Sequence, residues 1–212
     1  MSICSFCLRD YGSPWVTKRG DTFSKCTKCA QVSKKCRKGD GIYYSIDDAC
    51  YLTGTELAAH FADKTKPAVD ASGTEVEAKA PARQVLLDCH GVLDLFEPDE
   101  FKEILSSLPA GTKVAVLSFV GSTTGTRVSA HQQILKYGVP GYLCFARSDT
   151  PSPGSKGGFV QSTGVKLSFA DDSTDHVASV KATGSVALHV SSGMALHQRK
   201  KAIRDFLMRP AR

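Results

Sequence analysis

The sequence predicts an α/β protein in which a doubly wound, mostly parallel, Rossmann-like sheet follows a small cysteine-rich module. After residue 83, short apolar runs alternate with amphipathic segments of helical length, the pattern of parallel βαβ units. Before residue 53, six of the eight cysteines are clustered and large aliphatic side chains are few. That first segment therefore has too little apolar surface to fold on a hydrophobic core alone.

Each predicted element has a local physical reason. Thr53 begins a helix over 53–63 with apolar residues on one face, whereas 64–83 has almost no large apolar side chain and predicts a linker. Pro98 suits the first turn of a helix, and Gly138 and Gly184 end two others. The predicted strands are 83–88, 112–119, 141–146, 165–172 and 185–192, and the helices that follow them are 97–108, 127–138, 156–164, 173–184 and 193–209.

Four cysteines of the first module have the spacing of a metal site. The pairs "CSFC" and "CTKC" are separated by 18 residues, and two such knuckles place four thiolates around Zn²⁺ in a tetrahedron. We therefore predict a structural zinc ion held by Cys4, Cys7, Cys26 and Cys29 in a zinc-ribbon-like module. Cys36 and Cys50 either replace one of these ligands or remain free thiols. The predicted organisation is this module at 1–52, a helix and linker at 53–83, and an α/β domain at 84–212.

The predicted zinc module is strongly basic. Residues 1–40 contain nine Lys and Arg against three Asp, and the aromatic residues Trp15, Phe23, Tyr43 and Tyr44 lie among or just after these basic residues. This composition favours contact with a nucleic acid, through phosphate pairing and base stacking, although a zinc-stabilised module that binds a protein partner remains an alternative. The candidate nucleic-acid-binding residues are Lys18, Arg19, Lys25, Lys28, Lys34, Lys35, Arg37 and Lys38.

Chemically active side chains follow the predicted strands of the α/β domain. Asp88 ends the first strand, Ser118 lies near the end of the second, and Asp171 and Asp172 end the fourth, while Lys156 lies in the Gly-rich segment before it. The carboxyl ends of parallel strands share one edge of the sheet, where ligands bind in open α/β folds. Clustered carboxylates repel one another unless a cation lies between them, and Mg²⁺ prefers oxygen ligands. We therefore predict a magnesium site at this edge.

These positions resemble the four motifs of the haloacid dehalogenase (HAD) superfamily of phosphotransferases, over about residues 83–208. The family's first motif is an apolar strand ending in Asp-x-Asp-Gly, and here the sequence is "VLLDCHGV". The family's second motif, a strand ending in Ser or Thr, corresponds to "VAVLSF". Its third motif, a lysine, corresponds to Lys156, and its fourth, a strand ending in acids, corresponds to "LSFADDSTD".

The resemblance implies a role for each matched residue. Asp88 would be the nucleophile and a Mg²⁺ ligand, and the backbone carbonyl of His90 would be a second ligand. Ser118 would bind the phosphoryl group and Lys156 would neutralise it. Asp171 and Asp172 would complete the metal site, one directly and one through water.

One position departs from the family pattern. Phosphatases of the family have an acid/base Asp where this chain has His90. Histidine transfers protons near neutral pH, so His90 either serves as an unusual acid/base or marks a chain that has lost turnover. The sequence thus leaves two hypotheses: a Mg²⁺-dependent phosphatase acting through an aspartyl-phosphate, and a degenerate HAD-like scaffold whose zinc module binds a nucleic acid or a protein.

The short connections after the first and third strands leave little room for a cap domain. Capless members resembling this chain act on phosphoproteins and on nucleic-acid ends, so the expected substrate is macromolecular. His176 follows the acidic motif and is a candidate neighbour of the site. No apolar run approaches the roughly 20 residues of a membrane span, and the N-terminus lacks a signal-peptide layout, so we expect no membrane partner and an intracellular, cytoplasmic or nuclear location.

Overall fold

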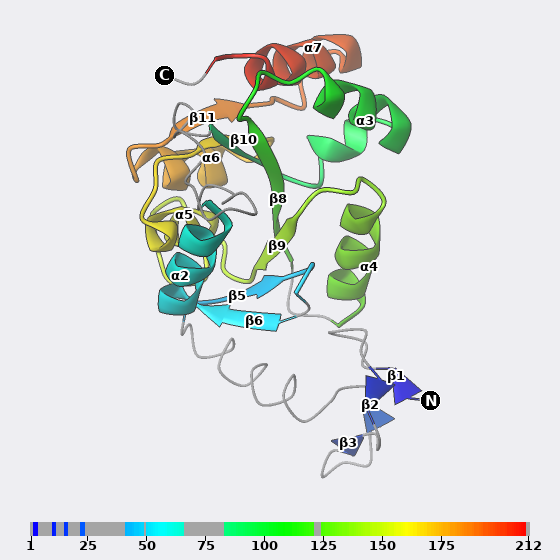
Figure 1. Cartoon of the computed structure of the whole chain (residues 1–212), viewed down its shortest axis with the longest axis vertical. Coiled ribbons are helices and arrows are strands. Elements are labelled where there is room, and N and C mark those ends of the chain that lie inside the picture. The colour runs from blue at the N-terminus through cyan, green and yellow to red at the C-terminus, as the bar shows by residue number, and fades with distance from the viewer. Residues whose placement is uncertain are drawn as a thin grey trace, which may run out of the picture.

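A seven-stranded sheet organises the described part of the chain (Figure 1). The computed structural model describes residues 41–48, 50–65, 83–120 and 124–210, and four two-residue strands near the N-terminus. Those short strands pair as antiparallel β1 (Ser2–Ile3) with β2 (Asp10–Tyr11), and β3 (Trp15–Val16) with β4 (Thr22–Phe23). The four predicted zinc ligands and the eight candidate nucleic-acid-binding residues lie outside the described residues.

The sheet has the order β11-β10-β7-β8-β9-β5-β6. The five strands from β11 to β9 are parallel, whereas β5 pairs antiparallel with both β9 and β6. The doubly wound, mostly parallel sheet predicted from the sequence is therefore confirmed. The strands are β5 (Ile42–Ser45), β6 (Cys50–Thr53), β7 (Gln84–Leu87), β8 (Lys113–Phe119), β9 (Gly141–Cys144), β10 (Ser168–Asp171) and β11 (Val186–His189).

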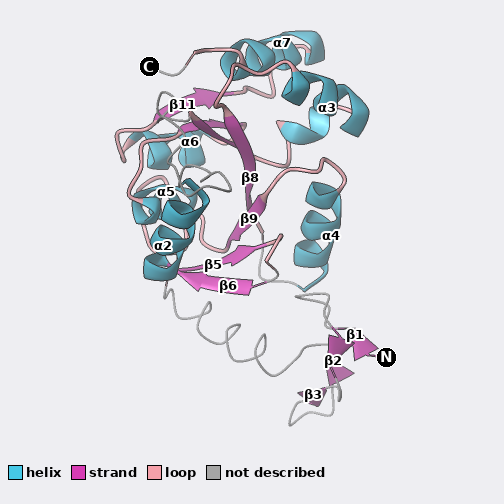
Figure 2. Cartoon of the chain, viewed as in Figure 1, coloured by secondary structure: helices cyan, strands magenta, loops and turns pink. Residues whose placement is uncertain are grey.

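Helices cover both faces of the sheet, as Figure 2 shows. Because side chains alternate along a strand, Leu86 of β7 joins one core while Val85 and Leu87 join the other. The core containing Leu86 is shared with α2 (Gly54–Thr65), α5 (Lys156–Thr163) and α6 (Thr174–Lys181). The opposite core is shared with α3 (Pro98–Ser106), α4 (Thr124–Leu135) and α7 (Leu196–Leu207), and a short 3-10 helix, η1, spans Leu93–Leu95.

The predicted boundary at residue 52 differs from the structure. Residues 42–53 form the β5–β6 hairpin, which extends the main sheet beyond β9 instead of belonging to the N-terminal module. The hairpin is anchored by Ile46, whose N–H donates to the Gly141 carbonyl at 2.8 Å. Tyr43 and Tyr44 pack into the two opposite cores and are almost fully buried, so neither can stack on a nucleic-acid base. Cys50, an alternative zinc ligand in the sequence, lies in strand β6 of this sheet.

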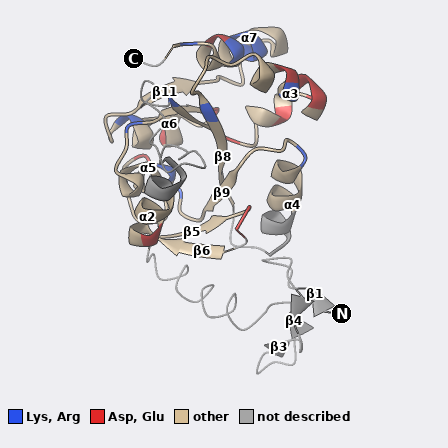
Figure 3. Cartoon of the chain, in the orientation of Figure 1, with Lys and Arg blue, Asp and Glu red and all other residues tan. Residues whose placement is uncertain are grey.

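The basic C-terminal helix is amphipathic and packs on the sheet. Its apolar face buries Ile203, Phe206 and Leu207. On its outer side, Lys200 and Arg204 form ion pairs of 2.7 and 2.5 Å with Glu100 of α3, and Figure 3 shows the acidic helix α3 beside the basic helix α7. Part of the positive charge of this helix is therefore neutralised within the fold. Within the described part of the chain, no helix is both long enough and apolar enough to cross a membrane.

The strand order creates one point where the connections change direction. From the central strand β7 the chain moves to β8 and β9 on one side, and then returns to β10 and β11 on the other. The connections on the two sides of β7 leave in opposite directions, which opens a crevice at the carboxyl ends of β7 and β10. Asp88 follows β7 and Asp171 ends β10, so the predicted site residues lie at this switch point.

Candidate functional site

Asp88 lies directly after β7, at the base of a cleft at the switch point. Its backbone N–H donates to the Ala170 carbonyl of β10 at 2.9 Å, which holds it against the neighbouring strand. Its carboxyl group is largely buried, and burial, the largest influence, raises its pKa. Asp171 acts in the same direction, whereas Lys156 opposes it. The site therefore gives this carboxylate few contacts with water.

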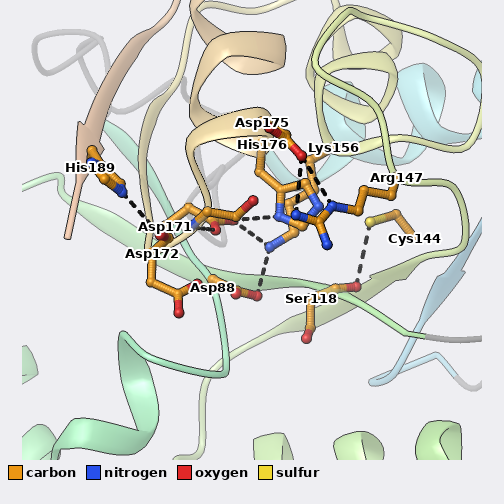
Figure 4. Close-up of polar contacts among 11 residues, drawn as sticks. Asp88, Ser118, Cys144, Arg147, Lys156, Asp171, Asp172, Asp175, His176 and His189 are labelled. Atoms are coloured by element: carbon orange, nitrogen blue, oxygen red, sulfur yellow. Dashed lines mark hydrogen bonds and ion pairs between the residues drawn. The ribbon is translucent and has the colours of Figure 1, made fainter. Parts of the chain in front are cut away.

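Lys156 is fully buried and bridges two of the carboxylates. Its Nζ lies 2.7 Å from Asp88 Oδ1 and 2.5 Å from Asp171 Oδ2 (Figure 4). The contact to Asp171 has hydrogen-bond geometry, whereas the contact to Asp88 is an ion pair. Burial by itself disfavours the ammonium form, but Asp88 and Asp171 hold the pKa of Lys156 above its ordinary value.

Helix α5 fixes the position of Lys156. Lys156 is the first residue of the helix, and the hydroxyl of the N-cap residue Ser155 accepts a hydrogen bond from the Gly158 N–H at 3.0 Å. The preceding loop is held by the β5–β6 hairpin, because the Gly154 N–H donates to the Tyr43 hydroxyl at 3.2 Å. The buried ammonium is thus placed by a helix cap and by a tyrosine of β5, the strand next to the β6 edge of the sheet.

The two aspartates at the end of β10 have different environments. Asp171 is fully buried: Oδ1 accepts the Ser173 N–H at 2.8 Å, and Oδ2 lies 2.5 Å from Lys156 Nζ and 3.3 Å from His176 Nδ1. Burial raises the pKa of Asp171. The opposing effect of Lys156 and His176 is larger, so the pKa lies below its ordinary value. Asp172 is partly exposed and lines the cleft. Asp171 therefore positions Lys156, while Asp172 faces the solvent side.

Among the described residues, Asp88, Asp171 and Asp172 form a group whose chemistry fits a metal ion. Each offers a carboxylate oxygen, and these atoms lie within 4.8 Å of one another. Three carboxylates beside one ammonium leave two negative charges, which a hard divalent cation would balance, and oxygen donors suit Mg²⁺. Asp88 and Asp172 also line the cleft, so they are the two best placed for direct coordination.

The cleft has a volume of about 570 Å³ and is open to solvent. Four of the residues considered in the sequence line it: Asp88, His90, Asp172 and His176. Ser118 is buried in β8, and its hydroxyl has no hydrogen-bond partner among the described residues. Ser118 does not line the cleft, so its contact with a bound phosphoryl group stays a prediction.

His90 lies on the turn after Asp88, with its side chain 60% exposed. Its Nδ1 lies 3.4 Å from Asp94 Oδ2, and the other oxygen of Asp94 accepts the Gly91 N–H at 2.7 Å. The hydrogen bond with Asp94 is the largest influence and raises the pKa of His90, whereas burial opposes this. Asp94 thus orients the imidazole through Nδ1, and Nε2 is the ring nitrogen that does not contact Asp94.

No protein-family model, curated protein or solved structure matches this chain. The chemistry of the site is therefore inferred from its own residues.

Several residues of the cleft were missed by the sequence analysis. Arg147 follows β9, Phe119 ends β8 and His189 ends β11, and all three line the cleft. His189 Nε2 lies 3.0 Å from the Asp172 carbonyl oxygen. Their position at or just beyond strand ends was the signal available, the same signal that identified Asp88 and Asp171.

Gly91 is required where the turn passes Asp172. Its φ is +73°, and a Cβ at this position would lie only 2.4 Å from Asp172 Oδ2. We expect Gly91→Ala to lower the free energy of unfolding by more than the about 1–2 kcal/mol that left-handed backbone strain alone costs, and to weaken Mg²⁺ binding by displacing Asp172. Urea denaturation and calorimetric Mg²⁺ titration measure the two effects.

Gly138 provides the matched control. It also has a positive φ, +66°, but a Cβ there meets nothing within 4 Å. Gly138→Ala should therefore show the backbone strain without any change in Mg²⁺ affinity. Equal Mg²⁺ affinities for the native protein and Gly91→Ala would contradict the predicted placement of Asp172 in a Mg²⁺ site.

Proposed function

We propose that this chain is a Mg²⁺-dependent phosphatase or phosphotransferase of the HAD type that acts through an aspartyl-phosphate on Asp88. The observation that carries the proposal is the placement of Asp88 at the floor of an open cleft, beside Lys156 and the two aspartates of β10. A carboxylate so placed can attack phosphorus, and the adjacent charges can stabilise the transferred group. The strand order supports the proposal, because the site occupies the switch point.

In the proposed reaction, an oxygen of Asp88 forms a bond to phosphorus while the bond from phosphorus to the leaving oxygen breaks. His90, held by Asp94, donates a proton to that leaving oxygen. Ser118 Oγ and Lys156 Nζ, both buried in this structure, would bind the phosphoryl oxygens. Water then attacks phosphorus and gives a proton to His90, the bond from phosphorus to Asp88 breaks, orthophosphate leaves and the Asp88 carboxylate is restored.

A bound Mg²⁺ would be held by Asp88 and Asp172, with Asp171 and the His90 carbonyl nearby, and would neutralise charge on the phosphoryl group. The open cleft supports a macromolecular substrate, either a nucleic-acid end or a phosphoprotein. We further propose that Cys4, Cys7, Cys26 and Cys29 bind a structural Zn²⁺, on the strength of their spacing, and that the basic residues around them contact the substrate.

The test is release of phosphate from an aryl phosphate, measured with Mg²⁺ and with a chelator. We expect turnover by the native protein that requires Mg²⁺, and a fall in kcat of about 100-fold in His90→Ala because the leaving group loses its proton donor. His90→Asp restores the acid/base type of the family and should remain active.

The outcomes separate the two hypotheses left by the sequence. Turnover by His90→Asp alone would mean that the site is intact but that His90 does not support catalysis. If neither the native protein nor His90→Asp releases phosphate, the phosphatase proposal is contradicted for small substrates. That result would favour the alternative, a degenerate scaffold whose N-terminal module binds a nucleic acid or a protein partner.

A further inference from the structure

Arg147 contributes a cation to the cleft that the proposed phosphoryl transfer does not use. It lies on the loop between β9 and α5, and its Nε and Nη2 atoms lie 3.2 and 3.1 Å from Asp175 Oδ2 (Figure 4). The side chains of Arg147 and Asp175 are 62% and 46% exposed. An ion pair this exposed contributes little to stability, so an incoming anion can compete with Asp175 for the guanidinium. Both contacts go to a single oxygen, which leaves the other N–H groups of the guanidinium available.

The same wall of the cleft contains polar groups that lack partners. Asp175 is in the first turn of α6, whose N-terminal residues Ser173 and Thr174 line the cleft. The N–H groups of a first helical turn have no intrahelical acceptor and favour anions. His176 is 5% exposed and also lines the cleft, and its Nε2 has no hydrogen-bond partner within the described ranges; the same holds for Ser173 Oγ. A buried nitrogen and hydroxyl left without partners beside a helix N-terminus indicate a ligand.

We propose that Arg147 and the first turn of α6 form a second anion subsite, which binds a further phosphate group of the substrate while the reacting phosphate lies at Asp88. This inference rests on the proposed function for the identity of the first phosphate, but the second subsite has its own residues. It narrows the substrate class to phosphate esters that carry at least two phosphate groups. Both subsites fit in one cleft because Asp88 and Arg147 line the same volume of about 570 Å³.

The test compares ligands with one and two phosphonate groups, which the protein cannot hydrolyse. Methylphosphonate and a series of alkane diphosphonates of increasing length are titrated calorimetrically into the full chain at a fixed free Mg²⁺ concentration. We expect the diphosphonate of the best length to bind at least about tenfold more tightly than methylphosphonate, the gain of one charge-assisted hydrogen bond. Arg147→Ala should abolish that gain and leave methylphosphonate affinity within about twofold.

Two further variants sharpen the test. Asp175→Asn removes the competing carboxylate, so it should tighten diphosphonate binding, the direction opposite to Arg147→Ala. Lys136→Ala also removes one exposed positive charge, but before β9, at the opposite edge of the sheet. It should leave the affinities for methylphosphonate and the diphosphonates unchanged.

A diphosphonate gain that persists in Arg147→Ala, or that falls equally in Lys136→Ala, would overturn the second subsite and leave the proposed phosphatase intact. Arg147-dependent diphosphonate binding without any methylphosphonate binding would support the subsite and contradict the proposed phosphoryl site. Binding of neither ligand would overturn both.

Discussion

Asp88→Asn is expected to abolish Mg²⁺-dependent release of phosphate, with a fall in kcat of about 1,000-fold or more. An amide is a poor nucleophile toward phosphorus, and it also removes a carboxylate from the cluster that fits Mg²⁺. The fold should survive, because Lys156 keeps its contact with Asp171 at 2.5 Å. Steady-state kinetics with an aryl phosphate measures the loss, and thermal unfolding shows that the variant is folded.

Asp99→Asn is the matched control for this substitution. Asp99 lies on the exposed first turn of α3, outside the cleft, so Asp99→Asn makes the same chemical change away from the site. It should retain native kcat and KM. If Asp88→Asn keeps native turnover while Asp99→Asn does the same, Asp88 is not the nucleophile and the proposed function is wrong.

Lys156→Met is expected to lower the free energy of unfolding by about 3–5 kcal/mol, the range for removing one partner of a buried ion pair. The substitution keeps the length of the side chain but leaves Asp88 and Asp171, both buried, facing each other without a cation. Their mutual repulsion and the lost contacts with the ammonium act in the same direction. Urea denaturation without Mg²⁺ measures the effect.

Two controls isolate the cause. Lys102→Met removes an exposed ammonium that lies 2.8 Å from Asp99, and it should leave the free energy of unfolding nearly unchanged. Adding Asp171→Asn to Lys156→Met removes one of the two unpaired carboxylates and should recover part of the lost stability. A Lys156→Met protein as stable as the native protein would show that the buried ammonium does not hold the carboxylates together.

The convergence of the aspartates could be predicted because it follows from strand direction. Apolar runs ending at Asp88 and Asp171 predict buried strands, and parallel strands bring their carboxyl ends to one edge. The helices were found for similar local reasons: Pro98 lies at the start of α3, and Gly138 and Gly184, with φ of +66° and +80°, lie just beyond the ends of α4 and α6. These signals are carried by neighbouring residues, so one sequence is enough to read them.

The β5–β6 hairpin could not be assigned in this way. Its pairing with β9 joins residues about one hundred positions apart, and no local pattern states which sheet edge a hairpin will cover. The adjacent Tyr43 and Tyr44 were interpreted as aromatic groups of a nucleic-acid surface. They are buried on opposite faces because this strand is covered on both sides.

The detailed contacts of the site also could not be predicted from the sequence. Lys156 was expected near the aspartates, but its bridge between Asp88 and Asp171 depends on the loop that Tyr43 holds. Arg147 was missed because it lies on a loop with no motif around it, and loop residues reach a cleft only through the surrounding fold.

The most direct test of the proposed function is whether Asp88 carries a phosphoryl group during turnover. The native protein is mixed with an aryl phosphate and Mg²⁺, quenched in acid and examined by peptide mass spectrometry. The proposed reaction predicts a phosphoryl group on the peptide that contains Asp88, and none on the same peptide of Asp88→Asn. Turnover that proceeds without any phosphoryl group on Asp88, under a quench shown to preserve acyl phosphates, would contradict it.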